Sequence, residues 1–228
     1  AGNADPRKRE VLIDAFLASP EFVDLWTYRL ARILRIRSQP NDAPGTERYF
    51  RWLREQVAND VAWDKIVRTL LVAEGDAHET GPPNFWRTTG DARAQAEFVS
   101  EALLGVRLRC ANCHNHPLER WTQDDYHGLA AIFARVDNGR IVRRLPHGEV
   151  IHPRTGQAAI AKLPADRFLE AVDANADLRA AFSDWLISPN NPYFARAFVN
   201  RVWKGLFGHG LVEPVDDLSV TNLASHPE

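Results

Sequence analysis

The cysteines of this chain constrain it more than any other feature. Only two occur among its 228 residues, Cys110 and Cys113, and His114 follows them directly. The spacing Cys-x-x-Cys-His is the pattern of c-type haem attachment. Two thiols one helical turn apart can each form a thioether with one haem vinyl group, and the adjacent imidazole then reaches the iron from the same side. The pattern therefore predicts one covalent haem c, attached through Cys110 and Cys113, with His114 as an axial ligand of the iron.

Other interpretations of the same residues stay open. A Cys-x-x-Cys pair can be a redox disulfide, although the proline-bearing segment that follows is unlike the strand-to-helix setting of a thioredoxin motif. Structural zinc needs four ligands, and Cys110 and Cys113 with His114 or His116 would need a further His from a distant part of the chain. The residues could also carry no ligand at all. Because no second compact Cys/His pair occurs in the sequence, haem c is the favoured interpretation.

The second axial ligand of the iron is harder to assign. The chain contains no Met, which excludes His/Met ligation from within it. His116 lies two residues after the proximal ligand, a span of at most about 7 Å, so we expect it near a haem propionate instead. The next helix carries His127, our first candidate for a distal ligand, and a long loop carries His78, our second. Arg109 and Arg120 flank the motif and are candidate partners for the propionates, since carboxylates favour guanidinium groups.

Composition excludes several other classes of protein. The chain is 45% hydrophobic, which is enough for a sizeable core and excludes a disordered chain. Its 28 Lys and Arg against 30 Asp and Glu give a net charge of −2, whereas nucleic-acid-binding domains are normally basic. No apolar run approaches the roughly 20 residues that span a bilayer. We therefore expect no nucleic-acid partner and no membrane span in this chain.

Apolar residues at helical spacing predict a mainly α-helical fold. Several predicted helices begin at cap residues, such as Ser19 before Pro20, Thr46, Asp91 and Thr122. The segment Thr122–Asp125 resembles a capping box. The predicted helices lie near residues 6–18, 20–34, 46–57, 63–71, 92–108, 123–133, 166–172, 178–186 and 194–207.

The region after residue 137 has a different character. Ile141–Leu145 and Glu149–His152 flank Pro146-His147-Gly148 and predict a short β-hairpin. We expect a helical haem domain over residues 1–137, a hairpin or linker insertion over 138–164, and a helical segment over 165–228 that includes the start of a second domain. The abrupt ending at Glu228 predicts that the natural chain is longer.

Several longer runs resemble a family of large secreted planctomycete proteins. A cytochrome c-like domain of unknown function in that family is similar to this chain over Leu17–Phe22, Gly81–Phe85 and, above all, Cys110–Tyr126 with Gly128–Val136. The planctomycete-specific domain that usually follows it is similar at its opening to Asn191–Trp203, Gly210–Asp217 and Ser225–Glu228.

The resemblance implies a secreted or periplasmic protein with haem c on Cys110, Cys113 and His114, but no established activity. This sequence differs from its relatives at His127, where they usually carry an aromatic residue, and at Leu223-Ala224, where Pro-Pro is usual. We expect an export signal upstream of Ala1, because thioethers form outside the cytoplasm.

The expected function is electron transfer to a redox partner protein, since no catalytic acid or base stands out. One alternative is a haem enzyme with an open distal face that acts on peroxide or a small molecule. Another is a structural module with zinc or a disulfide at the motif.

Overall fold

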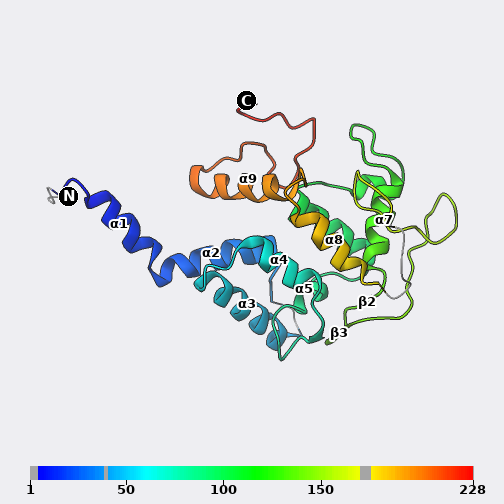
Figure 1. Cartoon of the computed structure of the whole chain (residues 1–228), viewed down its shortest axis with the longest axis horizontal. Coiled ribbons are helices and arrows are strands. Elements are labelled where there is room, and N and C mark those ends of the chain that lie inside the picture. Colours follow the sequence, from blue (N-terminus) through cyan, green and yellow to red (C-terminus); the bar gives the residue numbers. More distant parts are fainter. Residues whose placement is uncertain (1–4, 39–40, 170–175, 228) are drawn as a thin grey trace.

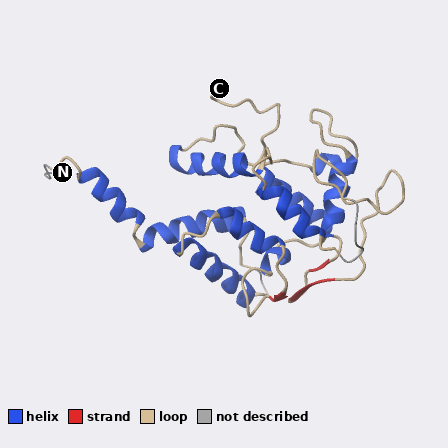
Figure 2. Cartoon of the chain, in the orientation of Figure 1, coloured by secondary structure: helices blue, strands red, loops and turns tan. Residues whose placement is uncertain are grey.

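Helices dominate the computed structural model, which describes residues 5–38, 41–169 and 176–227. Figures 1 and 2 show a cluster of helices with a small sheet at one edge. The first helices are α1 (Lys8–Leu17), α2 (Pro20–Ile33), α3 (Ala43–Ala58) and α4 (Trp63–Leu71), followed by the short α5 (Asn84–Arg87). The remaining helices are α6 (Ala92–Val99), the π-helical turn η1 (Ser100–Leu104), the 3-10 turn η2 (Arg109–Asn112), α7 (Gln123–Phe133), α8 (Leu178–Ile187) and α9 (Phe194–Phe207).

A single hydrophobic core joins helices from both halves of the chain. Leu53 of α3, Leu70 of α4, Phe98 of α6, Phe133 of α7 and Phe182 of α8 all belong to it and are almost fully buried. The rings of Phe133 and Phe182 meet edge to face, with their centroids 5.5 Å apart. Helix α8 is therefore part of the same core as the helices that precede it.

Three of the predicted helix starts are formed by side-chain caps. The Ser19 hydroxyl accepts a hydrogen bond from the Phe22 N–H, and the Asp91 carboxylate accepts one from Ala94. Thr122 and Asp125 form the predicted capping box at the start of α7. Helix α3 begins earlier than predicted, at Ala43 and not after Thr46, because Pro44 fits the first turn of a helix.

Helix α1 carries the apolar residues that the sequence predicts, but their side chains are exposed. Val11, Leu12 and Phe16 are 57%, 53% and 62% exposed, and Figure 1 shows the helix extending away from the rest of the molecule. Ile13 and Leu17 are exposed as well. The apolar residues lie on several sides of this helix, so no single face is available for the core.

The helix predicted over residues 92–108 ends early, at Leu104. Gly105 takes a left-handed conformation, with φ of 64°, and the Val106 N–H bonds back to the Ser100 carbonyl. A Cβ at Gly105 would lie 3.1 Å from the Cβ of Ala197 in α9. The chain therefore turns at the residue where α9 crosses closely, and it leaves the helix before it reaches the cysteines.

The predicted β-hairpin is wrong in its pairing. Strand β3 (Ile141–Arg144) is central in a three-stranded antiparallel sheet, between β1 (Gly75–Asp76) and β2 (Val136–Asp137). It does not pair with residues 149–152, where Ile151 forms only an isolated bridge to Ala158.

The physical reason for this difference lies at the C-terminal end of α7. The Leu145 N–H bonds to the Arg135 carbonyl, and a Cβ at Gly148 would clash with the Ala134 carbonyl oxygen at 2.2 Å. The chain after β3 thus runs along α7 and does not fold back on the strand.

Two further sequence expectations concern single segments. The helix predicted over 166–172 is not formed at its start, where Phe168 bridges Lys162 in an extended conformation, and residues 170–172 lie outside the described part of the chain. Among the helices of the described residues, none has the length and apolar character that a membrane crossing requires.

Candidate functional site

The two cysteines lie on the outside of a tight turn. Residues Arg109–Asn112 form the 3-10 turn η2, which is anchored by Ala111, a fully buried residue whose N–H bonds to the Leu108 carbonyl at 2.8 Å. The Cys113 N–H closes the turn on the Cys110 carbonyl at 3.4 Å. Because Ala111 points into the core, Cys110 and Cys113 face solvent, and both are free thiols.

The imidazole of His114 has one nitrogen fixed by the backbone. Its Nδ1 lies 2.8 Å from the carbonyl oxygen of Asn115. A carbonyl only accepts hydrogen bonds, so Nδ1 carries the proton and Nε2 of the neutral ring keeps a lone pair. The side chain is exposed. This arrangement of a ring N–H on a backbone carbonyl is the one that orients metal-binding histidines.

Helix α7 holds the motif from behind. Gln123 and His127 are four residues apart and so lie on one face of the helix. The Gln123 amide donates to the Cys113 carbonyl at 2.9 Å, and His127 Nε2 donates to the Asn112 carbonyl at 3.0 Å. The Gln123 N–H also bonds to the side-chain oxygen of Asn115 at 3.0 Å. Both ends of the segment from Asn112 to Asn115 are therefore tied to the first turns of α7.

His127 is held as a neutral side chain. It is only 1% exposed, and burial lowers its pKa although the Asn112 carbonyl works in the opposite direction. With Nε2 bonded to that carbonyl, Nδ1 has no hydrogen-bond partner among the described residues. The ring lies 4.9 Å from that of His152, which is also buried. A distal-ligand role for His127 stays a prediction; in this structure its Nε2 is engaged within the motif.

His78 belongs to a separate polar cluster. Its Nε2 lies 2.6 Å from Oδ1 of Asp42. The other carboxylate oxygen of Asp42, Oδ2, lies 2.5 Å from Arg87. Burial acts to raise the pKa of Asp42, but the hydrogen bonds from His78 and Arg87 outweigh it and lower the pKa. Asp42, directly before α3, thus binds both the loop that carries His78 and Arg87 of α5. Its role as a second distal candidate also stays a prediction.

The remaining predicted site residues lie around the motif. His116 is half-buried; its N–H bonds to the Trp121 carbonyl, and its Nδ1 accepts from Leu118 at 3.3 Å. Arg120 covers the Trp121 ring and donates to the Ala165 carbonyl at 3.2 Å. Arg109 is exposed next to Cys110.

Two exposed apolar side chains near the motif were missed by sequence reasoning. Leu118 is 68% exposed and Val220 is 74% exposed. The Val220 N–H bonds to the side chain of Glu119 at 2.7 Å, which brings the C-terminal part of the chain to the segment that follows the motif. Only the fold could reveal this neighbour, because a separation of about a hundred residues leaves no local signal.

The described residues include the groups that haem c attachment requires. Both thiols are accessible and unpaired, the adjacent imidazole has a free Nε2, and apolar side chains lie nearby. Within residues 5–38, 41–169 and 176–227, no group of three or more His, Cys, Asp or Glu side chains is arranged to hold a metal ion. The zinc interpretation therefore has no second pair of ligands there.

Comparison with known proteins gives two matches. Residues 1–138 match the family PSCyt2, described as a protein of unknown function (DUF1549). Residues 178–228 match PSD1, also described as a protein of unknown function (DUF1553). No curated protein and no solved structure matches the chain. The first match covers more than half of the 228 residues, and the chain therefore belongs to the PSCyt2 family, the planctomycete cytochrome-like family that its sequence resembles.

Proposed function

We propose that this protein is an extracytoplasmic c-type cytochrome that carries one covalent haem and transfers electrons. The observation that carries the proposal is the motif itself: Cys110 and Cys113 are exposed free thiols on one turn, and the next residue, His114, has its Nδ1 fixed and its Nε2 free. These are the groups that haem attachment and axial ligation require.

The chain's own residues would each have a defined task in attachment. Each thiol would add across one vinyl group of the haem, with the sulfur bonded to carbon and the S–H proton transferred to the vinyl group, and would need no oxidant. His114 would hold the iron through Nε2 while its Nδ1–H stays on the Asn115 carbonyl, which would fix the ring and make it a stronger ligand. Gln123 and His127 hold the carbonyls between the attachment points. When bound, the haem supplies one-electron iron chemistry.

The position of the motif favours exchange of electrons with another protein. Cys110, Cys113 and His114 are all exposed, so a haem attached there would have an edge near the surface, where a redox partner can approach. The exposed side chains of Leu118 and Val220 supply an apolar rim for such a contact. The partner is a second protein that presents its own redox group.

A second candidate function has one observation in its favour. Both distal candidates already have Nε2 engaged, His127 with the Asn112 carbonyl and His78 with Asp42. An iron with only His114 bound would have an open face, as in haem enzymes that act on peroxide or another small molecule.

The ferric spectrum of haem-loaded protein distinguishes the two functions. A low-spin spectrum without carbon monoxide binding to the ferrous form supports the electron carrier. A high-spin spectrum with rapid carbon monoxide binding supports the enzyme. In both cases the methionine–iron charge-transfer band should be missing, because the chain has no Met. If the wild type is low-spin, His127→Ala should turn it high-spin where His127 is the ligand; an unchanged spectrum assigns the ligand elsewhere.

We propose an extracytoplasmic location because thioether formation uses a maturation route outside the cytoplasm. The gene should therefore encode an export signal upstream of Ala1. A precursor that begins near Ala1 without such a signal contradicts this location.

A further inference from the structure

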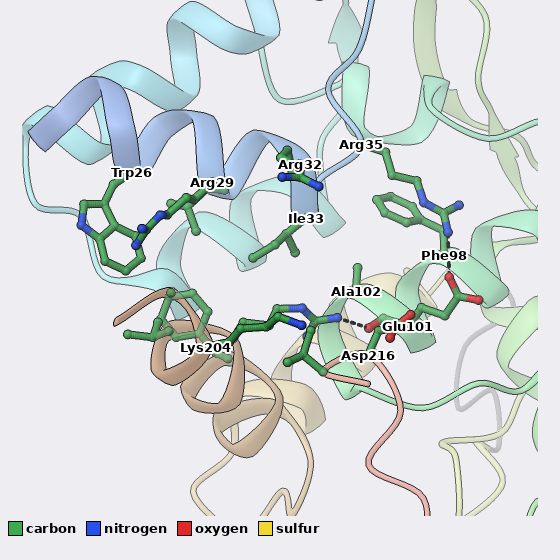
Figure 3. Close-up of a pocket in the computed structure, with 16 residues that line it drawn as sticks. Trp26, Arg29, Arg32, Ile33, Arg35, Phe98, Glu101, Ala102, Lys204 and Asp216 are labelled. Atoms are coloured by element: carbon green, nitrogen blue, oxygen red, sulfur yellow. Dashed lines mark hydrogen bonds and ion pairs between the residues drawn. The ribbon is translucent and has the colours of Figure 1, made fainter. Parts of the chain in front are cut away.

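A cleft of about 530 Å³ lies between α2, η1 and α9, and the proposed haem attachment does not involve it. Figure 3 shows Trp26, Arg29 and Ile33 of α2 along one side and Lys204 of α9 on the other. Its volume falls in the range of small-molecule sites, which hold roughly 300–1,000 Å³. None of the residues that line it belongs to the Cys-x-x-Cys-His segment.

The charges that line this cleft are mainly positive. Five cationic side chains face two carboxylates, Glu101 and Asp216; the cations are Arg29, Arg32, Arg35, Arg201 and Lys204. Arg35 pairs with Glu101 at 2.7 Å, and Asp216 pairs with Arg107 at 2.9 Å. Both carboxylates are therefore already neutralised by partners.

Three of the arginines remain without a carboxylate. Lys204 pairs with Glu213 at 3.0 Å, whereas Arg29, Arg32 and Arg201 form no ion pair with any residue of the described chain. The five cations of the lining thus outnumber its two carboxylates, and the cleft has an excess of positive charge.

Among these three arginines, Arg201 has a guanidinium that is fixed by backbone carbonyls. Its guanidinium donates to the Glu101 backbone carbonyl at 2.6 Å and to the Ala197 carbonyl at 3.3 Å, so it is held in place by neutral groups. Burial lowers its pKa, although the nearby carboxylates of Asp216 and Glu101 act in the opposite direction without forming an ion pair with it. Arginine stays charged in proteins, and a cation removed from water is costly unless an anion accompanies it. An anionic ligand in the cleft would supply that partner.

Guanidinium groups lie over aromatic rings at both ends of the cleft, and of the two rings Trp26 is partly exposed while Phe98 is buried. The Arg29 guanidinium lies over the Trp26 ring, 5.1 Å from its centroid, and Arg35 lies over Phe98 at 4.7 Å. Planar guanidinium groups also stack on flat ligands. The site therefore offers both charge for an anionic group and flat surfaces for an aromatic ring.

The space beside Arg29 depends on a glycine in α9. A Cβ at Gly205 would lie 2.8 Å from an Nη atom of Arg29. Glycine is less favourable than alanine inside a helix, so its occurrence within α9 is consistent with a need for room at this point.

We propose that this cleft binds a small organic anion, with a phosphate or carboxylate group held by Arg29, Arg32 and Arg201 and a flat aromatic body lying against Trp26. The site is independent of haem attachment, because its lining residues and those of the motif do not overlap.

Isothermal titration calorimetry with 1-naphthyl phosphate tests this proposal on the intact chain. One molecule should bind per chain, and 1-naphthol and inorganic phosphate should each bind at least tenfold more weakly. Equal binding of 1-naphthol would show a merely apolar surface and overturn the proposal. Equal binding of inorganic phosphate, or no binding of 1-naphthyl phosphate at millimolar concentration, would also overturn it.

Variants then locate the site. The double variant Arg29→Gln/Arg32→Gln and the blocking variant Gly205→Leu should each weaken binding at least tenfold. Arg196→Gln, on an exposed position of α9 outside the cleft, should leave it unchanged. Arg201→Gln should weaken binding too, and circular dichroism melting checks that it folds; if it does not, the other two variants decide. Unchanged binding in the folded double variant would refute this location.

Discussion

The backbone carbonyls of Asn112 and Cys113 show how single residues prepare the candidate site. Neither Gln123 nor His127 is part of the Cys-x-x-Cys-His pattern, yet both donate to carbonyls inside it. The pattern could be predicted from the sequence because its spacing is a local signal. Its support could not, because a Gln or His on a helix gives no sign of which carbonyl it will meet after folding.

Replacing Gln123 by Leu should destabilise the protein by about 1 kcal/mol, the usual cost of leaving a carbonyl without its donor. The Cys113 carbonyl would lose the 2.9 Å hydrogen bond from the amide. The matched control is Gln56→Leu in α3, whose amide reaches only the Trp52 carbonyl of its own helix, at 3.4 Å. Urea denaturation measures both free energies of unfolding, and equal losses in the two variants contradict the supporting role of Gln123.

Asp125 connects the cap of α7 to the chain after residue 160. Its carboxylate binds Lys162 at 2.7 Å and accepts from the N–H groups of Thr122 and Ala165 at 2.9 and 3.0 Å. Burial acts to raise its pKa, but these hydrogen bonds prevail and lower the pKa below the ordinary 3.8. Its contribution to stability is therefore fully present above the unfolded-state pKa and is lost as the pH falls through the lower folded-state value.

Changing Asp125 to Asn should cost about 3 kcal/mol at pH 7, because the partly buried Lys162 ammonium is left without its counter-charge. The difference between wild type and variant should shrink as the pH falls below about 4, since the wild-type carboxylate then gains a proton. Denaturation over a range of pH values measures this; a difference that stays constant down to pH 2 would argue against the ion pair.

Among the helices and strands, the sequence predicts where several helices start, but it does not predict how the elements pack on one another. The caps at Ser19, Asp91 and Thr122 are formed as the sequence indicates, because a cap depends only on residues a few positions apart. The helical stretch formed by α6 and η1 ends at Gly105, where α9 lies close. The pairing of β3 depends on the contact of Gly148 with the end of α7. Such contacts leave no periodic pattern, so sequence reasoning extended the helix too far and paired the wrong strands.

Helix α1 gives the clearest test of what packing adds. Leu12→Ser should change the free energy of unfolding by less than about 0.5 kcal/mol, as for other exposed positions, because Leu12 is 53% exposed. Leu53→Ala in α3 should cost about 2–5 kcal/mol, because Leu53 is fully buried. Urea denaturation compares them; a loss of several kcal/mol in Leu12→Ser would mean that α1 packs on the protein in solution.

At the scale of the whole molecule, the two family matches share one core. Helix α8 lies within the second match and α7 within the first, and Phe182 of α8 packs directly on Phe133 of α7. The sequence predicts the helical character of both regions. It could not predict that they pack together, because amphipathic helices do not specify which partner covers their apolar face.

The shared core predicts that both regions unfold together. Phe182→Ala should lower the free energy of unfolding by about 3–5 kcal/mol, and the loss should affect the whole chain. Circular dichroism and tryptophan fluorescence should then report one coincident transition in wild type and variant. Two separate transitions, with only the later one shifted in the variant, would show that the two regions are independent.

A covalent haem on Cys110 and Cys113 stays attached when the protein is denatured, so the mass of the denatured protein tests for it. The chain should be exported in a host that attaches c-type haem, then denatured, stripped of loose ligands with acidic acetone, and weighed by mass spectrometry. We expect the wild-type protein to show a mass excess of one haem and the double variant Cys110→Ala/Cys113→Ala to show none. Wild-type protein that has the mass of the bare chain, or that retains zinc and no porphyrin before denaturation, would contradict it.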